Sequence, residues 1–189
     1  MQESTVLDFF RKAGALLEGH FRLSSGLHSD RYLQSALVLQ YPEFAEQLGR
    51  DLADRTAHLQ PTVVLSPALG GIVIGQEVGR ALSVRAIFAE RENGVLALRR
   101  GFSLAPSDRV LIVEDVLTTG GSTRETAALA QAAGAHVVGA GCIVDRGSDP
   151  GGLGLPLQAL VRLEVPTYSS DACPLCAKGE PVVKPGSRS

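Results

Sequence analysis

The sequence predicts an α/β fold in which an open, mainly parallel sheet is flanked by helices, with a small strand-rich subdomain beside the sheet. Short apolar runs at residues 63–65 and 110–113 lack the polar alternation of a half-exposed strand. Such runs suit strands that are buried on both faces of a parallel sheet. They alternate along the chain with segments of helical periodicity, and this alternation is typical of parallel βαβ units.

Two elements are expected before the sheet begins. The first is an amphipathic helix with Ser4 as its N-cap and Gly19 as its end, because apolar residues recur at helical spacing between them. These apolar residues are Val6, Phe9, Phe10, Ala13, Leu16 and Leu17. Residues 21–39 then mix alternating polarity with a Ser-Gly turn, which predicts the strand-rich subdomain.

From Pro42 the pattern becomes regular, and residues 42–165 are expected to form the core. Phe44, Leu48 and Leu52 mark its first helix. The further elements expected are strands at residues 63–65, 86–89, 110–113, 137–144 and 157–163, the last at an edge, and helices at 74–82 and 123–133. A chain of 189 residues that is 44% hydrophobic can bury one sizeable core, so residues 1–189 are expected to form a single domain.

Composition argues against several classes of protein. The formal net charge is −2, so the chain lacks the positive charge of a nucleic-acid-binding groove. The most apolar window, residues 63–78, is interrupted by Pro67 and three glycines, and it does not predict a membrane span. The polar N-terminus lacks the pattern of a signal peptide, and we therefore expect a cytoplasmic protein.

The most informative segment runs from Val110 to Thr123. An apolar run leads into Glu114 and Asp115 and then into a hydroxyl- and glycine-rich turn that opens a helix. The backbone N–H groups of residues 118–122 can bind a phosphate, since a helix N-terminus adds roughly half a positive charge there. The two carboxylates can accept hydrogen bonds from vicinal ribose hydroxyls. The segment fits neither a Walker loop nor a dinucleotide fingerprint. It predicts a ribose-phosphate site, with a metal-binding or structural acid pair as the alternative.

Residues 114–123 resemble the phosphoribosyl-diphosphate (PRPP) signature of the type I phosphoribosyltransferases. The resemblance extends along nearly the whole chain to the orotate phosphoribosyltransferases. Residues 25–32 are similar to the family's Ser-Gly segment, residues 67–71 to its diphosphate loop and residues 145–147 to its late arginine site. The resemblance implies a type I phosphoribosyltransferase-like fold, in which about residues 20–40 and the C-terminal segment form a hood over the base.

The resemblance also implies an activity, which is transfer of 5-phosphoribosyl from PRPP to orotate in pyrimidine biosynthesis. It implies Mg²⁺ held mainly by PRPP, with no dedicated protein cage, and a homodimer. The implied catalytic residues are Asp115 and Glu114, to which the need for positive charge at the diphosphate adds Arg91, and orotate is expected to contact Thr118 and Arg146. The implied PRPP-binding residues are Leu69, Gly70, Glu114, Asp115, Val116, Leu117, Thr118, Thr119, Gly120, Gly121 and Ser122.

The chain departs from the family pattern at two places. In many relatives a mobile loop carries lysines and a histidine across a dimer interface to the diphosphate, but residues 90–101 here contain neither residue type. Neutralising the diphosphate requires only a cation, so Arg91, Arg99 or Arg100 can act in place of the lysine. Arg91 is favoured because it follows a sheet strand. The second departure is Ser24, where relatives often have a lysine.

Rival functions stay open from the sequence. A purine or uracil phosphoribosyltransferase would use the same motif, because the motif recognises ribose phosphate and not the base. A non-catalytic PRPP-sensing regulator would tolerate the missing loop lysine. A metal phosphatase or phospho-acceptor is weakened because no nucleophile-activating base follows the acid pair. For Arg146, a local ion pair with Asp145 or Asp149 is the alternative to orotate binding.

The cysteines pose a separate question. Cys142 lies in an apolar run and is expected to be an inert core residue. Cys173 and Cys176 have zinc-knuckle or redox spacing, but a structural zinc needs four ligands and the chain has no second pair. Two pairs from a dimer, or reduced structural thiols, are both open.

The histidines show no clustering along the sequence that would indicate a metal centre. His20, His58 and His136 are therefore assigned nothing. His28 and Arg31 lie beside a glycine turn, where a solvated loop is the favoured interpretation.

Overall fold

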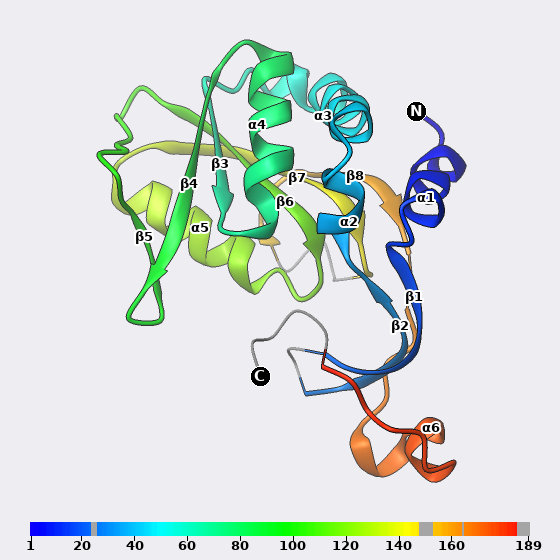
Figure 1. The fold of residues 1–189 in the computed structure, drawn as a ribbon. Coiled ribbons are helices and arrows are strands. Elements are labelled where there is room, and N and C mark those ends of the chain that lie inside the picture. Colours follow the sequence, from blue (N-terminus) through cyan, green and yellow to red (C-terminus); the bar gives the residue numbers. More distant parts are fainter. Residues whose placement is uncertain (24–25, 148–152, 164, 185–189) are drawn as a thin grey trace.

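The computed structural model describes residues 1–23, 26–147, 153–163 and 165–184, and its centre is a six-stranded sheet (Figure 1). The strand order is β5-β4-β3-β6-β7-β8. Neighbouring strands are parallel except that β5 runs antiparallel to β4. The expected mainly parallel sheet with an edge strand at its end is confirmed. The strands are β3 (Val63–Pro67), β4 (Arg85–Glu92), β5 (Val95–Leu98), β6 (Arg109–Leu117), β7 (His136–Asp145) and β8 (Leu157–Arg162).

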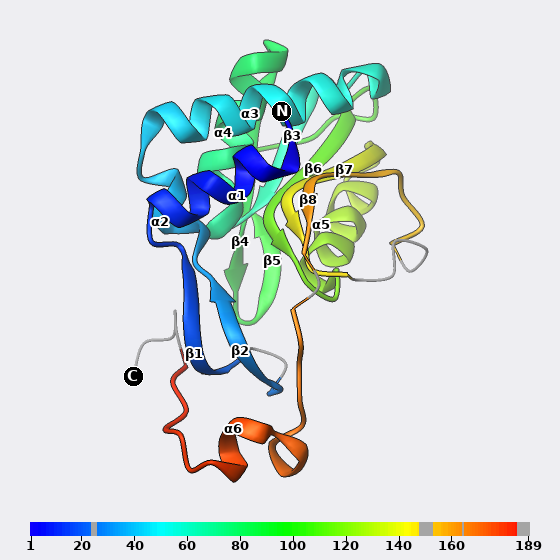
Figure 2. The ribbon, with the colours of Figure 1, turned by 90° about the vertical axis from the view of Figure 1, so that its right-hand side faces the viewer.

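Helices cover both faces of the sheet (Figures 1 and 2). Val64 and Leu111 belong to an apolar cluster shared with α1 to α4, whereas Val63 and Val110 pack with α5 on the other face. Since both faces bury side chains, the strands are apolar without alternation. The helices are α1 (Glu3–Lys12), α2 (Ser35–Leu39), α3 (Pro42–Thr56), α4 (Gly70–Leu82) and α5 (Gly121–Ala132), with short turns at η1 (Ala57–Leu59), η3 (Ser170–Ala172) and α6 (Pro174–Ala177).

None of the helices in the described ranges combines the length and the apolar character that crossing a bilayer would require.

The N-terminal helix is shorter than its apolar pattern predicts. Its N-cap is Gln2 and not Ser4. It ends before Gly14, whose φ of 62° is a conformation that suits glycine and interrupts a helix. Leu16 and Leu17 then open a strand, so their assignment to the helix was wrong. Their spacing fits either element, and the turn at Gly14 decides between them.

A β-hairpin takes the place of the loop expected at residues 90–101. Arg91 of β4 lies opposite Leu96 of β5. Asn93 and Gly94 connect the two strands with φ values of 51° and 86°, as a two-residue hairpin turn requires. An Asn-Gly pair between two strand-like segments indicates a two-residue hairpin turn. The expectation of a loop was wrong because it did not take this pair into account. Arg91 is therefore fixed on a sheet strand.

A small antiparallel sheet of β1 (Leu16–Arg22) and β2 (His28–Leu33) projects from the main sheet (Figure 2). Residues 165–184 return beside it, because Phe21 bridges to Val183 and His28 bridges to Tyr168. We call β1, β2 and residues 165–184 the hood. The expected strand-rich subdomain is confirmed. Ser24 and Ser25 of the expected Ser-Gly segment lie outside the described residues.

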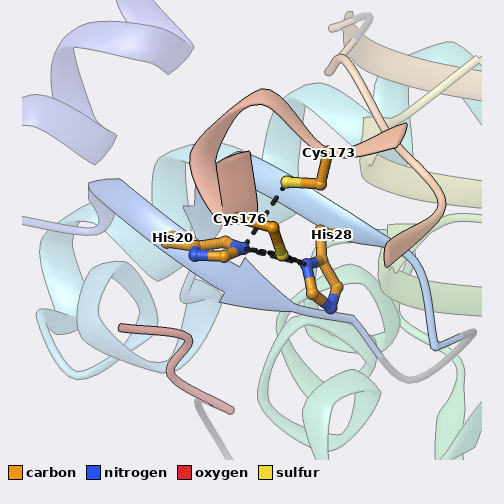
Figure 3. Close-up of side chains that lie close together, drawn as sticks. All are labelled: His20, His28, Cys173 and Cys176. Atoms are coloured by element: carbon orange, nitrogen blue, oxygen red, sulfur yellow. Dashed lines mark hydrogen bonds between the residues drawn. The ribbon is translucent and has the colours of Figure 1, made fainter. Parts of the chain in front are cut away.

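Two histidines of the hood are buried, against expectation. His20 is 4% exposed and His28 is 6% exposed. Both side chains lie against Cys173 and Cys176 (Figure 3). The sequence left His20 unassigned and placed His28 on a solvated loop, and both interpretations were wrong because the returning C-terminal segment covers the hairpin. Cys142 is buried as expected, and burial raises the pKa of its thiol.

Candidate active site

A cleft with a volume of about 880 Å³ lies between the carboxyl end of the sheet and the hood. Residues from β4, β6, α5 and the segment after β7 line it together with residues of the hood. The sequence-predicted residues that line it are Arg91, Glu114, Asp115, Val116, Thr118, Thr119, Gly120, Gly121, Ser122 and Arg146. The predicted residues that do not line it are Leu69, Gly70 and Leu117.

Glu114 lies inside the last part of β6, since this strand continues past the apolar run to Leu117. The hydroxyl of Thr123 in α5 donates a hydrogen bond of 2.5 Å to the Glu114 carboxylate. Burial raises the pKa of Glu114 to about 7; the Asp115 carboxylate also raises it, while the Thr123 hydroxyl partly lowers it. A cleft carboxyl that changes ionisation near neutral pH is typical of a functional site.

Asp115 lies against the start of α4. A Cβ placed on Gly70 would lie 2.6 Å from one oxygen of the Asp115 carboxylate and 2.7 Å from the other. Gly70 therefore leaves room for the carboxylate, although it does not line the cleft. Burial raises the pKa of Asp115, and the main-chain N–H of Val116 partly offsets this. Leu69 is 82% exposed, and the peptide bond between Ala68 and Leu69 is cis.

The turn after β6 has the backbone expected of a phosphate-binding turn. Gly120 is the N-cap of α5 and has a φ of 70°. A side chain at Gly120 would be strained by this left-handed φ, and its Cβ would lie 2.7 Å from a Leu153 methyl group that would have to shift. Thr118 and Thr119 are exposed ahead of the helix, and within the described ranges no side chain caps its start. The helix N–H groups are thus available to an anion. The Leu117 side chain packs in an apolar cluster, and its main-chain oxygen accepts a hydrogen bond of 2.9 Å from the N–H of Arg146.

Arg91 lines the cleft, whereas Arg99 and Arg100 do not. The Arg91 guanidinium forms an ion pair of 2.9 Å with Glu125 of α5. Arg99 instead forms an ion pair with Glu92 of β4, and Arg100 forms one with Glu90 of β4. The structure thus brings the favoured arginine of the three to the acid pair and the turn.

Arg146 follows β7 and enters the cleft beside Tyr32. Burial lowers the pKa of Arg146, and Tyr32 acts in the opposite direction. Among the described residues, the buried Nε of Arg146 has no hydrogen-bond partner. The carboxylate of Asp145 lies 3.3 Å from Arg162, and Asp149 lies outside the described residues. A buried guanidinium donor requires an acceptor, which a ligand in the cleft can supply.

Tyr32 and Arg124 also line the cleft, and sequence reasoning assigned neither a role. Burial raises the pKa of Tyr32, Asp115 raises it further, and Arg146 lowers it. The phenol therefore lies within electrostatic reach of both groups. Arg124 adds a positive charge in the first turn of α5. The sequence could have indicated both residues. Tyr32 ends the segment 25–32 that resembles the family's Ser-Gly segment, and Arg124 directly follows the motif at residues 114–123.

Comparison with known proteins gives matches over the whole chain. The family model described as phosphoribosyl transferase domain matches residues 36–151. The orotate phosphoribosyltransferase of Pelotomaculum thermopropionicum is 53% identical over 188 residues, covering 100% of this chain and 99% of the relative. That of Desulforamulus reducens is 50% identical, covering 100% and 98%. The crystal structure of orotate phosphoribosyltransferase from Aeropyrum pernix superposes with a TM-score of 0.69 at 26% identity, covering 84% of this chain and 94% of that one.

Proposed function

The chain belongs to the orotate phosphoribosyltransferases, and from this premise we propose that it transfers the 5-phosphoribosyl group of PRPP to orotate. The products are orotidine 5′-monophosphate and diphosphate, formed in pyrimidine biosynthesis. One observation carries the proposal. A single cleft joins an acid pair, a main-chain turn at a helix N-terminus and an arginine with an unpartnered buried Nε among the described residues.

The ribose-phosphate end of PRPP fits the β6–α5 connection. The 5-phosphate would accept hydrogen bonds from the N–H groups of residues 118–122, assisted by the positive end of α5. Glu114 and Asp115 lie in β6 directly before this turn, and they would accept hydrogen bonds from the two ribose hydroxyls. The close approach of Gly70 to Asp115 supports this role, because it keeps the carboxylate beside the loop where the diphosphate would lie.

The diphosphate end needs positive charge. Arg91 is the cation best positioned for it, since it lines the cleft and its partner Glu125 is exposed enough to release it. Glu114 and Asp115 also fit Mg²⁺, because their carboxylate oxygens are hard ligands. No third acidic or histidine group joins them in a ligand cluster within the described residues, which suits an ion that binds mainly through substrate oxygens and water. When bound, Mg²⁺ would neutralise charge on the leaving diphosphate.

Orotate would lie between the hood and the end of β7. Its carboxylate would accept hydrogen bonds from the Arg146 guanidinium, and the Thr118 hydroxyl would contact the ring. Tyr32 of the hood lies beside Arg146 and would cover the base. With the base bound, Tyr32 of the hood together with Leu23 and Leu27 of the β1–β2 connection would limit water at this end of the cleft, which would strengthen each polar contact.

The reaction breaks the bond from ribose C1 to the diphosphate oxygen and forms a bond from C1 to N1 of orotate, whose N1 proton passes to solvent or to the released diphosphate. The ribose gains positive character in the transition state. The acid pair stabilises that charge from the hydroxyl side, while Arg91 stabilises the departing negative charge. Arg146 and the turn hold the two reactants at opposite ends of the cleft, so the chain acts mainly by positioning and electrostatics.

An assay with PRPP, Mg²⁺ and a panel of orotate, uracil, adenine and hypoxanthine tests the proposal. Of the four bases, only orotate is expected to give diphosphate release, and Asp115→Asn should abolish most of that release. Turnover with a purine or with uracil in preference to orotate would assign a different base. Tight PRPP binding with no product from any base would instead support a PRPP-sensing regulator.

A homodimer and a cytoplasmic location remain predictions from the sequence. The dimer is expected to have twice the mass of one chain in solution by light scattering. A monomeric and fully active protein would show that the cleft needs no residue from a second copy.

A further inference from the structure

Four metal-ligating side chains converge in the hood, and none of them lines the cleft. His20 lies on β1, His28 opens β2, Cys173 is the N-cap of α6 and Cys176 lies within that single turn (Figure 3). One ligand atom from each residue belongs to a group whose members all lie within 4.8 Å of one another. The β1–β2 hairpin and a C-terminal segment far from it in the sequence thus place two imidazoles and two thiols around one point.

Three nitrogen–sulfur separations lie close to those of a tetrahedral site. His20 Nε2 lies 3.5 Å from the sulfur of Cys173 and 3.7 Å from that of Cys176. His28 Nδ1 lies 3.2 Å from the Cys176 sulfur. In a tetrahedral site with Zn–N bonds of about 2.0–2.1 Å and Zn–S bonds of about 2.3 Å, neighbouring ligand atoms lie about 3.3–3.8 Å apart. The two nitrogens, 2.8 Å apart, would separate by about 0.5 Å to admit the ion.

A second observation orients His20 for coordination. Its Nδ1 lies 2.8 Å from the main-chain oxygen of Glu180. A carbonyl oxygen can only accept, so Nδ1 carries the proton and Nε2 presents its lone pair to the cluster. Metal-binding histidines usually donate their second N–H to a carbonyl or carboxylate in this way, which fixes the tautomer and the ring orientation.

The backbone around the cluster is held from both sides. The N–H of Val183 donates to the carbonyl of His20 at 2.8 Å, and His28 exchanges two hydrogen bonds with Tyr168 at 2.8 and 2.9 Å. His20, His28 and Cys173 are 4%, 6% and 3% exposed, whereas Cys176 lies at the exposed side of the cluster. Buried polar groups require partners, and an ion would supply one to the three buried side chains while also binding the Cys176 sulfur.

We propose that this cluster is a structural zinc site, with Zn²⁺ bound by His20 Nε2, His28 Nδ1 and the sulfurs of Cys173 and Cys176. Two thiolates balance the charge of the ion, and binding releases both thiol protons to solvent, while His28 stays neutral by carrying its ring proton on Nε2. The set is closed, with four protein ligands and no open position, so the ion holds the structure and does not act on substrate. Borderline-soft nitrogen and sulfur ligands select zinc over Mg²⁺.

The site would fix one wall of the cleft. Leu23 and Leu27 lie between the two histidines in the sequence and line the cleft, as do Val165 and Thr167 ahead of the cysteines. Joining the C-terminal segment to the β1–β2 hairpin would therefore set the position of both cleft-lining segments. Loss of the ion should loosen this wall while leaving the acid pair and turn on the main sheet in place.

Metal analysis of the full chain, purified under reducing conditions with zinc supplied, tests the proposal. About one zinc ion per chain is expected. Cys176→Ser and His20→Gln should lose most of it, while the control variants His58→Gln and Cys142→Ala, which change the same residue types outside the cluster, should keep it. Replacement by Co²⁺ should give the absorption bands of a tetrahedral site with thiolate ligands, and Cys176→Ser should weaken them.

A measurement on the unaltered chain covers the case in which a cluster variant does not fold. Chelation followed by removal of the chelator should lower the Tm, and added Zn²⁺ should restore it, whereas added Mg²⁺ should not. The KM for orotate, measured with excess Mg²⁺, should rise on chelation and recover with zinc. The proposal is overturned if the reduced chain binds neither Zn²⁺ nor Co²⁺ in stoichiometric amount, if the control variants lose the metal equally, or if Cys173 and Cys176 form a disulfide despite added zinc.

Discussion

The ionisation of Glu114 should make PRPP binding depend on pH. Burial raises the pKa of this carboxyl to about 7, so about half of the free protein carries a neutral Glu114 at pH 7. Accepting hydrogen bonds from both the Thr123 hydroxyl and a ribose hydroxyl favours the ionised form. The ionised fraction falls from about 0.9 at pH 8 to about 0.09 at pH 6, so the Kd for PRPP should rise about tenfold over this range.

The same pKa shift has the opposite sign for stability of the free protein. A carboxyl whose folded pKa lies above its unfolded value binds more protons when folded. Its stabilisation is fully present below the usual value of 4.5 and is lost as pH rises through about 7. The shift sets an upper bound of about 3 kcal/mol, which solvent in the cleft reduces. Lowering the pH from 8 to 6 should therefore stabilise the free fold while weakening PRPP binding.

Isothermal titration calorimetry in two buffers of different ionisation enthalpy measures both the Kd and the protons released. The 5-phosphate of PRPP itself titrates at about pH 6. Glu114→Gln is therefore the matched control, because it keeps the titration of the phosphate and removes that of Glu114. The unaltered chain should release more protons at pH 6 than this variant, and its Kd should change more steeply with pH. Identical proton release and identical pH dependence in the two proteins would refute the reasoning.

Three substitutions test the other parts of the cleft. Gly70→Ala should raise the KM for PRPP at least about fivefold, because its Cβ would lie 2.6 Å from an Asp115 oxygen and overpacking costs about 1–3 kcal/mol; an unchanged KM would separate Asp115 from PRPP binding. Arg146→Ala should raise the KM for orotate about tenfold or more with little effect on that for PRPP, and equal effects on both substrates would contradict this assignment. Arg91→Ala should lower kcat about tenfold or more, whereas Arg100→Ala, on a side chain outside the cleft, should leave it within about twofold; matching losses in steady-state kinetics would remove the special role of Arg91.

The sheet could be predicted because its strands are buried on both faces and carry continuous apolar runs. The ends of the strands could not be predicted, because backbone pairing continues through polar residues. β6 is an example: Glu114 and Asp115 stop the apolar run, yet pairing with β7 persists to Leu117. The boundary between α1 and β1 was missed because two leucines at Leu16 and Leu17 fit helix and strand patterns equally.

The ribose-phosphate part of the site could be predicted because its residues are consecutive in the sequence. The turn geometry follows from local chemistry, including the left-handed Gly120. Side-chain direction could not be read in the same way, and Leu117 shows this, since its side chain enters the core. Contacts that depend on tertiary folding were beyond reach: Cys173 meets His20 across 153 residues of sequence, so neither spacing nor composition pairs them.

A crystal structure with orotidine 5′-monophosphate tests the central assignment of the cleft most directly. The phosphate should lie on the N–H groups of residues 118–122, the ribose hydroxyls on Glu114 and Asp115, and the orotate carboxylate on Arg146. A nucleotide bound outside this cleft, or bound within it with its phosphate away from the β6–α5 turn, would contradict the account.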